Sequence, residues 1–280
     1  MTEVRNILIL GRTGSGKSTL ANVLVNKNDN FEEVFKESSS SVSETNEFKD
    51  EKFNWNGITY RIVDTIGIGD TKLAKDKVYK DIANAAHAIR GGINQILYVI
   101  KGRFDEKEVE TLNRLKTYIL GSNAIKYTTI VITNFEEFKS ESSRNKDLQR
   151  LITESNEGIK GFINGCNGVV YVNNPSVSQN TTEGNDSDDE DFLRLKIKQA
   201  YKQRNASRVV LLSHLEEKCK GIYEDKVLNE VHERIKDLLA ELAAESAAEK
   251  RDEKRMKDLE FKIEQEVKTV VRTKCTCNLL

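Results

Sequence analysis

The sequence predicts an α/β fold in which a mostly parallel sheet, with one antiparallel strand, carries helices on both faces and is followed by a long α-helical C-terminal extension. Over residues 1–220, short apolar runs of β-type pattern alternate with helical stretches, which favours parallel strands joined through helices. Asn56-Gly57 is a strong hairpin turn signal, so the strand that ends near Trp55 pairs antiparallel with the strand that follows. Over residues 221–280 the composition is rich in Ala, Glu, Lys and Arg, which is typical of long helices.

A glycine-rich loop joins the first strand to the first helix. Residues 4–10 form a buried apolar run, and residues 17–26 have the spacing of a helix with one apolar face. The segment from Gly11 to Ser18 has the form G-x-x-x-x-G-K-[ST], whose backbone turns its N–H groups toward phosphate oxygens. Lys17 then reaches the β- and γ-phosphates of a nucleotide, and the hydroxyl of Ser18 coordinates Mg²⁺. The residues expected to hold the phosphates are Gly11, Arg12, Thr13, Gly14, Ser15, Gly16, Lys17, Ser18 and Thr19.

A second motif follows the next parallel strand. Residues 58–63 have a β-type pattern, and Asp64 and Gly67 follow them as D-x-x-G. An Asp at this point holds a water on the Mg²⁺ ion, and the Gly offers its backbone N–H to the γ-phosphate. The hydroxyl-rich stretch between the two motifs suits a switch loop in which Ser43 or Thr45 supplies one Mg²⁺ ligand, and the alternative is a plain flexible linker. The expected metal ligands are Ser18, Ser43 and Asp64.

A third β-patterned run, over residues 127–133, delivers polar residues to the carboxyl end of the sheet, where ligands bind in open α/β folds. The carboxylate of Glu136 can accept two hydrogen bonds there from N1 and N2 of guanine, which adenine does not offer in the same way. The last strand is followed by Asn173 and Asn174. Either amide contacts the base from the other side, or both are ordinary turn residues. The expected base-side residues are Thr133, Asn134, Glu136, Asn173 and Asn174.

With these motifs in place, the chain resembles the AIG-type GTPases, also called the immune-associated nucleotide-binding or GIMAP family of the P-loop NTPases. The resemblance covers about residues 4–220 and includes residues 96–108, which are similar to the family's own signature box. It implies a P-loop G domain that binds GTP or GDP with Mg²⁺. The sequence departs from the family at Asn134, where a basic residue is usual, and at Glu136, where Asp is usual. The added methylene of Glu136 changes the reach of the carboxylate.

The residue after the D-x-x-G motif bears on hydrolysis. Fast intrinsic GTP hydrolysis of the Ras type uses a side chain such as Gln there to orient the attacking water. Here the residue is Ile68, so we expect slow hydrolysis that depends on electrostatic help from elsewhere. The resemblance implies that loaded domains pair across the nucleotide and that Arg103 of the signature box acts on the partner's site. The alternative is that Arg103 is a surface residue that caps the following helix. The expected catalytic residues are Lys17 and Arg103.

Composition limits the class of protein. The chain has 280 residues, and its 44 Lys and Arg against 45 Asp and Glu give a net charge of −1. No overall field favours nucleic acid, and no basic and aromatic interleaving suggests a face that binds it. No apolar run approaches the length of about 18 residues that spans a bilayer, and the N-terminus runs straight into the first strand instead of a signal peptide. Four scattered cysteines do not suit a disulfide framework or a zinc site. We therefore expect a cytoplasmic protein that does not bind nucleic acid.

The G domain is expected over residues 1–220 and the helical extension over residues 221–280. A helix over residues 207–219 should pack on the G domain and mark its edge. The segment 176–191 before it is polar and then acidic, which predicts a solvated, mobile loop.

An apolar seam with alternating three- and four-residue spacing predicts a long helix in the extension. Acidic residues interrupt the middle of this seam at Glu245, Glu249 and Asp252. The seam therefore suits either a coiled coil or two shorter packing patches, one of them folded back on the G domain. The last four residues, which begin at Cys277, have the form C-a-a-X with a terminal Leu. This pattern predicts geranylgeranylation and reversible association with a membrane.

Together these features predict a protein that binds Mg²⁺·GTP, hydrolyses it slowly and switches by forming a homodimer or homo-oligomer through its nucleotide face. Two alternatives stay open. One is a non-catalytic scaffold that binds guanine nucleotide in order to assemble. The other is an ATP-using P-loop protein whose base site differs from the one described above.

Overall fold

The computed structural model describes residues 4–37, 49–64, 75–118, 121–177, 187–248 and 251–277. Within these residues one sheet has the strand order β2-β3-β1-β4-β5-β6. The strands are β1 (Val4–Gly11), β2 (Lys49–Trp55), β3 (Ile58–Asp64), β4 (Gln95–Lys101), β5 (Thr128–Thr133) and β6 (Val169–Tyr171). The α-helices are α1 (Lys17–Val25), α2 (Lys75–Ala88), α3 (Glu106–Tyr118), α4 (Glu141–Glu154), α5 (Glu157–Gly165), α6 (Ser187–Lys218), α7 (Lys226–Ala247) and α8 (Glu253–Cys277). Short 3-10 helices are η1 (Lys27–Asp29) and η2 (Ser122–Tyr127).

The sheet is parallel except at its β2 edge. β2 pairs antiparallel with β3, and Trp55 lies opposite Ile58 across the turn. Asn56 and Gly57 form this turn with φ angles of 47° and 78°, a left-handed conformation that Asn and Gly adopt more readily than other residues. The other neighbouring pairs of strands are parallel. The α/β fold class predicted from the sequence, with its single antiparallel pairing, is confirmed.

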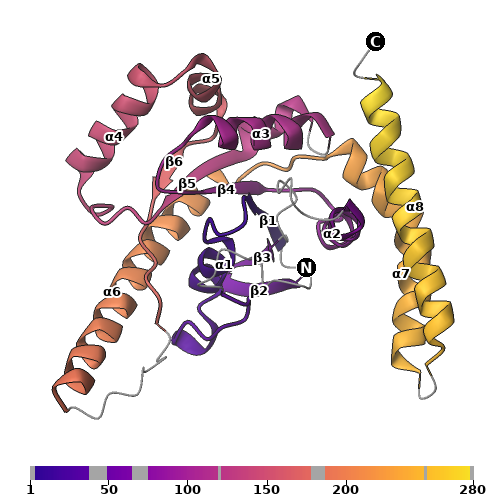
Figure 1. The fold of residues 1–280 in the computed structure, drawn as a ribbon, viewed down its shortest axis with the longest axis horizontal. Helices are drawn as coiled ribbons and strands as arrows, with labels where there is room; N and C mark the ends of the chain where they lie inside the picture. The colour runs from indigo at the N-terminus through magenta and orange to yellow at the C-terminus, as the bar shows by residue number, and fades with distance from the viewer. Residues whose placement is uncertain are drawn as a thin grey trace.

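Helices cover both faces of the sheet (Figure 1). Side chains along a strand alternate between the two faces, so Ile7 and Ile9 of β1 join one core while Leu8 and Leu10 join the other. Helices α1 and α6 close the first core. Helices α2, α3 and α5 close the second core together with α7 and α8. These layers fix the loops that leave the carboxyl ends of the parallel strands.

Helix α6 is longer than the sequence predicted. The helix expected over residues 207–219 is its last part, but α6 begins at Ser187. Residues 187–191, which were expected in a mobile loop, therefore belong to its first turns. An acidic run suits that place because the unpaired N–H groups of a helix N-terminus carry a partial positive charge. Of the rest of the expected loop, residues 178–186 lie outside the described residues.

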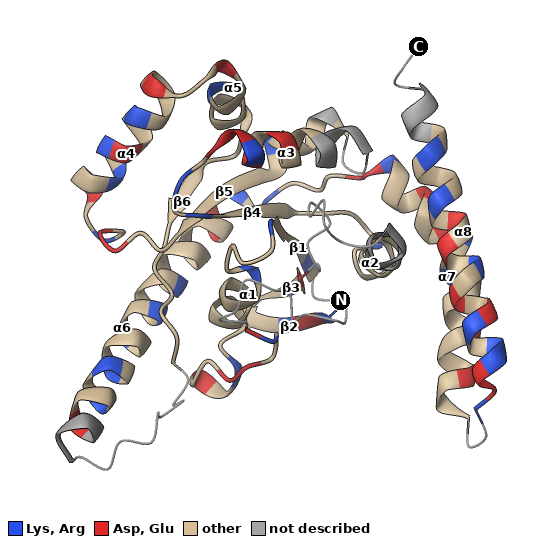
Figure 2. Ribbon diagram, in the orientation of Figure 1, with Lys and Arg blue, Asp and Glu red and all other residues tan. Residues whose placement is uncertain are grey.

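The C-terminal extension forms two helices instead of a single long one. α7 and α8 lie antiparallel and side by side (Figure 1). Acidic and basic residues are mixed along both helices (Figure 2), and Arg234 of α7 pairs with Glu266 of α8 at 3.3 Å. Apolar side chains of both helices join the core that α2 also closes. Of the alternatives drawn from the sequence, the structure shows the shorter packing helices folded back on the G domain.

The chain reverses where the predicted seam turns acidic. The carboxylate of Glu245, near the end of α7, accepts a hydrogen bond from the backbone N–H of Asp252 at 2.9 Å. Asp252 in turn accepts from the N–H groups of Lys254 and Arg255 at 3.0 and 3.1 Å, and so caps the start of α8. These carboxylates satisfy backbone donors at a helix end, whereas in a continuous seam they would face apolar neighbours.

The end of α8 carries the predicted lipid acceptor. Cys277 is the last residue of this helix, and residues 278–280 lie outside the described part of the chain. Among the helices described, none combines the length and the apolar character needed to cross a membrane. Lipid attachment at Cys277 and association with a membrane stay predictions.

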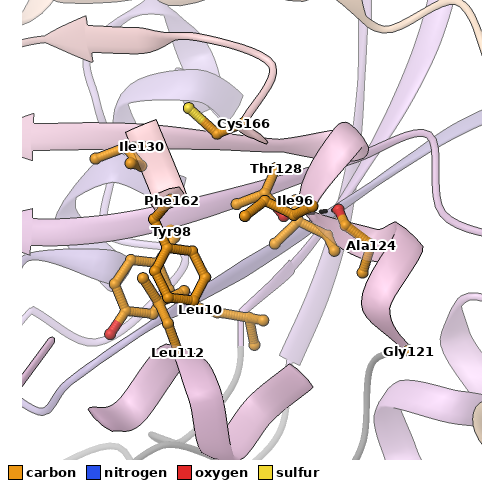
Figure 3. A pocket seen from close by; sticks show the side chains of 11 residues that line it. Leu10, Ile96, Tyr98, Leu112, Gly121, Ala124, Thr128, Ile130, Phe162 and Cys166 are labelled. Carbon is orange, nitrogen blue, oxygen red and sulfur yellow. Dashed lines mark hydrogen bonds between the residues drawn. The ribbon is translucent and has the colours of Figure 1, made fainter. Parts of the chain in front are cut away.

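A small apolar cavity lies between the sheet and helices α3 and α5 (Figure 3). Leu10, the residue before the glycine-rich loop, lines it together with Leu112 of α3 and Phe162 of α5. Cys166 also faces this space, and burial raises the pKa of its thiol, so the sulfur stays neutral near pH 7.

Two histidines meet where the C-terminal extension packs on the G domain. The rings of His87 on α2 and His232 on α7 lie with their centroids 5.4 Å apart. Arg90 Nη1 lies 3.5 Å from His87 Nε2. Burial lowers the pKa of His87, and the nearby charges of Arg90, His232 and Arg61 lower it further. The folded protein therefore favours the neutral form of His87.

Acidification should weaken this interface. The pKa of His87 is lower in the folded than in the unfolded chain, so below about pH 6.5 the unfolded state binds more protons. The free energy of unfolding therefore decreases as the pH is lowered. His87→Gln should make the melting temperature less dependent on pH between about pH 7.5 and 5.5. His214, whose pKa burial also lowers, should account for part of the remainder. An unchanged pH dependence in the His87 variant would contradict this assignment.

Candidate functional site

The glycine-rich loop folds because glycine occupies its tightest positions. Gly11, Gly14 and Gly16 have φ angles of 144°, 76° and 94°. A Cβ atom added to Gly11 would overlap the carbonyl oxygen of Val99 on the neighbouring strand β4. The loop is closed by a hydrogen bond from the N–H of Ser15 to the carbonyl of Arg12 at 3.2 Å. Its backbone is thereby held in a concave turn ahead of α1, the arrangement that receives phosphates.

Lys17, Ser18 and Asp64 converge at the start of α1. Lys17 is only 8% exposed, and its Nζ donates to the carbonyl of Arg12 at 2.9 Å. The hydroxyl of Ser18 donates to Oδ2 of Asp64 at 2.7 Å. Asp64 is 3% exposed and ends β3, so the sheet delivers this carboxylate from a neighbouring strand. A hydroxyl and a carboxylate oxygen side by side suit Mg²⁺, which prefers hard oxygen ligands and retains several waters.

Arg12 connects the loop to the signature box. Its guanidinium lies 3.5 Å from Glu108 of α3, and Glu108 accepts a hydrogen bond from the hydroxyl of Tyr98 at 2.7 Å. Burial raises the pKa of Glu108, while its contacts with Tyr98 and Arg12 oppose this shift. No local pattern predicts this link, because Arg12 lies more than 80 residues before the segment that contains Tyr98 and Glu108.

Thr133 and the residues after it form the base side of the site. The Thr133 hydroxyl donates to the carbonyl of Ser15 at 2.9 Å, so the end of β5 supports the glycine-rich loop directly. Asn134 is exposed and has a φ of 58°, which Asn tolerates better than most residues. Phe135 donates its backbone N–H to the carbonyl of Val172 at 3.2 Å. The exposed residue Glu136 is thereby held beside the loop that follows β6.

The two asparagines of that loop differ in their surroundings. The side-chain amide of Asn173 donates to Gln203 at 3.1 Å, and its backbone N–H and carbonyl both bond to the hydroxyl of Ser207. Both polar atoms of the Asn174 side chain are buried and have no hydrogen-bond partner among the described residues. A buried amide is costly unless a ligand or water satisfies it. The geometry therefore favours Asn174 over Asn173 as the residue that contacts a base.

Arg103 lies at the surface after β4. Its side chain is exposed and makes no hydrogen bond or ion pair within the part of the chain that the structure describes. Phe104, the next residue, is buried and anchors the segment, and Asp105 caps α3 by accepting from the N–H of Glu108 at 3.0 Å. Arg103 is therefore not the residue that caps this helix.

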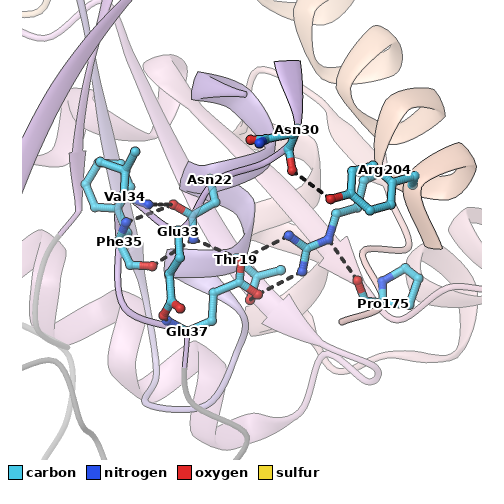
Figure 4. A network of polar contacts seen from close by, with 10 residues as sticks. Thr19, Asn22, Asn30, Glu33, Val34, Phe35, Glu37, Pro175 and Arg204 are labelled. Atoms are coloured by element: carbon cyan, nitrogen blue, oxygen red, sulfur yellow. Dashed lines mark hydrogen bonds and ion pairs between the residues drawn. The ribbon is translucent and has the colours of Figure 1, made fainter. Parts of the chain in front are cut away.

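Four residues named from the sequence lie outside the described residues. They are the alternative hydroxyl ligands Ser43 and Thr45, and Gly67 and Ile68 of the second motif. The structure adds three polar residues that no sequence motif indicated: Asn22 and Arg204 are buried, and both contact the partly buried Glu37 (Figure 4).

A model of the AIG1 family matches residues 5–219. Immune-associated nucleotide-binding protein 13 of Arabidopsis thaliana is 27% identical over 175 residues, which are 59% of this chain and 50% of that protein. Immune-associated nucleotide-binding protein 5 of the same organism is 29% identical over 181 residues, which are 63% and 55%. This chain thus spans about half the length of these relatives. Among solved structures, Toc33 from Arabidopsis thaliana in complex with GDP and Mg²⁺ is 20% identical, with a TM-score of 0.43 and coverage of 73% of this chain and 86% of that one.

The loop geometry predicts unequal effects of alanine at two glycines. Gly11→Ala should lower the free energy of unfolding by about 2–4 kcal/mol, because the methyl group meets a backbone oxygen and φ is unfavourable. Gly14→Ala is the control, since only its φ is unfavourable and nothing lies within 4 Å of the added carbon, so the loss should be about 1 kcal/mol. Urea denaturation measures both values, and equal losses would contradict the close approach of Gly11 to β4.

Proposed function

Because the chain belongs to the AIG1 family, we propose that it binds Mg²⁺·GTP, hydrolyses it slowly and switches by nucleotide-dependent pairing of two copies. The observation that carries this proposal is the meeting of Ser18 and Asp64 beside a complete phosphate-binding loop, with Lys17 buried at the same helix start. The family and the names of the relatives, which are nucleotide-binding proteins, support a GTP-binding P-loop protein.

Each group in the loop has a task in this proposal. The backbone N–H groups of residues 11–16 and the N-terminus of α1 bind the phosphate oxygens. The ammonium group of Lys17, which donates a hydrogen bond to the carbonyl of Arg12 in this structure, binds the β- and γ-phosphates when nucleotide is present. Ser18 and Asp64 hold Mg²⁺, directly and through water. When bound, the ion neutralises charge that develops on the phosphates during transfer.

Guanine selectivity is proposed to arise from two side chains that approach the base from different loops. Glu136 accepts from guanine N1 and N2, and the amide of Asn174 contacts the base from the other side. The amide of Asn174 is buried without a partner among the described residues, which supports its contact with the base. The hydrogen bond from the N–H of Phe135 to the carbonyl of Val172 supports the closeness of the two loops.

Removing the carboxylate should change selectivity more than overall nucleotide binding. Glu136→Ala should weaken GTP by at least about tenfold while ATP affinity changes little, because only guanine loses two hydrogen bonds. Glu137→Ala is the matched control, since it removes the exposed carboxylate of the next residue. Titration of each variant with both nucleotides measures the effect. Equal losses for GTP and ATP would place the base elsewhere and favour the ATP-using alternative.

Hydrolysis is proposed to need a second copy of the chain. Ile68 offers no hydrogen bond to the attacking water, so the transition state lacks the usual orienting group. The exposed Arg103 has no partner within the described residues and is free to reach a facing site, where its charge stabilises the transferring phosphate.

Turnover per site should therefore rise with protein concentration. Arg103→Ala should keep its GTP affinity but hydrolyse GTP about 10³-fold more slowly at high concentration, as expected when an arginine supplied in trans is lost. Lys101→Ala, which removes a neighbouring exposed charge, should behave like the unmodified chain. Single-turnover hydrolysis measured over a range of concentrations gives the answer. Concentration-independent turnover, or full activity of the Arg103 variant, would contradict catalysis by a second copy, and GTP binding without turnover would favour the non-catalytic scaffold.

A further inference from the structure

We propose that Arg204 of α6 is a positioning residue for nucleotide recognition, which joins the loop beside the base to the helix beside the phosphates. This inference rests on the proposed function, because it assigns a role at the edge of the same site. Arg204 is completely buried and is the largest such side chain in the described part of the chain. Its guanidinium has partners on two sides (Figure 4).

The first partner belongs to the base-side loop. Nε of Arg204 donates to the carbonyl of Pro175 at 2.8 Å. Pro175 directly follows Asn174, and other side chains of α6 hold Asn173 on the opposite side, as described above. Helix α6 thus fixes the backbone before and after Asn174 and leaves its buried amide without a partner among the described residues. This is the arrangement expected of a group kept in place for a ligand.

The second partner connects to the phosphate side. Nη1 and Nη2 of Arg204 donate to the two carboxylate oxygens of Glu37 at 3.0 and 2.8 Å, which is a bidentate ion pair. The same carboxylate accepts from Thr19 of α1 at 3.1 Å and from Asn22 of α1 at 2.9 Å. Thr19 directly follows Ser18 of the phosphate-binding loop. One partly buried carboxylate therefore joins Arg204 to the helix whose N-terminus faces the phosphates.

Stability alone does not require this arrangement. Arg204 is fully buried, and the side chain of Glu37 is 21% exposed. An ion pair with a buried member is commonly replaced by apolar residues of similar size without loss of stability, because removing charge from water is costly. The guanidinium also does what an apolar or ammonium group cannot do in the same place. Its planar fork donates two hydrogen bonds to the carboxylate of Glu37 and a third to the carbonyl of Pro175. What the pair adds is a fixed distance between α1 and the base-side loop.

Loss of this contact should weaken recognition of the base more than binding of the phosphates. A displacement of a binding group by about 1 Å is enough to reduce its contribution strongly. If Arg204 sets the position of Asn174, its loss should lower the preference for GTP over ATP. A side chain that only fills the core would instead affect both nucleotides in the same proportion.

The test uses the full chain and four variants. They are Arg204→Met, Glu37→Met, the double variant Arg204→Met/Glu37→Met, and the control Arg208→Met. Arg208 lies one turn further along α6, is partly buried, and donates to the carbonyl of Leu24 without contacting the base-side loop. The double variant removes both charges together, so it should remain folded even where a single variant, which leaves one charge unpaired, does not. Calorimetric titration with Mg²⁺·GTP and Mg²⁺·ATP gives the ratio of the two affinities for each protein.

The double variant should remain folded and lose about tenfold of the GTP-to-ATP affinity ratio, whereas Arg208→Met should keep the ratio of the unmodified chain. An unchanged ratio in the folded double variant, or a proportional loss for both nucleotides, would overturn the role of Arg204 alone. Equal affinities of the unmodified chain for GTP and ATP would overturn the proposed function and this inference with it.

Discussion

The site depends on the close approach of the glycine-rich loop to the end of a neighbouring parallel strand. Gly11 leaves no room for a side chain against the carbonyl of Val99, and Thr133 of the following strand donates to the loop at Ser15. Because β1, β3, β4 and β5 are parallel, their carboxyl ends meet at one edge of the sheet. Lys17 and Ser18 begin α1, and Asp64 ends β3. They meet at this edge because β1, which leads into the loop and α1, pairs with β3.

Buried polar side chains then join the loops that the sheet brings to this edge. Asn22 satisfies the backbone of residues 34 and 35 with its amide and also reaches Glu37. Glu108 joins Arg12 of the loop to Tyr98 of β4, and Glu37 joins α1 to Arg204. Burying such a polar group costs free energy unless its hydrogen bonds are satisfied. The contacts therefore favour one position of each loop.

Local patterns were enough to predict the strands around the loop, the hairpin at Asn56-Gly57 and the helix that follows Lys17. They did not predict contacts between distant segments. Arg204 and Glu37 are separated by 167 residues, and a charge at one position of a helix says nothing about its partner. A signal was nevertheless present, since Arg204 follows Ala200 and precedes Leu211 along one buried stripe of α6, where an unpaired arginine would not be tolerated. For a related reason the sequence left two alternatives for the region of α7 and α8, because acidic residues suit both a solvated seam and a helix cap.

The most direct test of the central claim is titration of the unmodified chain with Mg²⁺·GTP and Mg²⁺·ATP, followed by measurement of the mass of the loaded protein in solution. If two copies pair across a guanine-nucleotide site, GTP should bind at least about tenfold more tightly than ATP, and the mass should double only with GTP. Equal binding of the two nucleotides, or a GTP-loaded protein that keeps the mass of one chain at every concentration, would contradict the account.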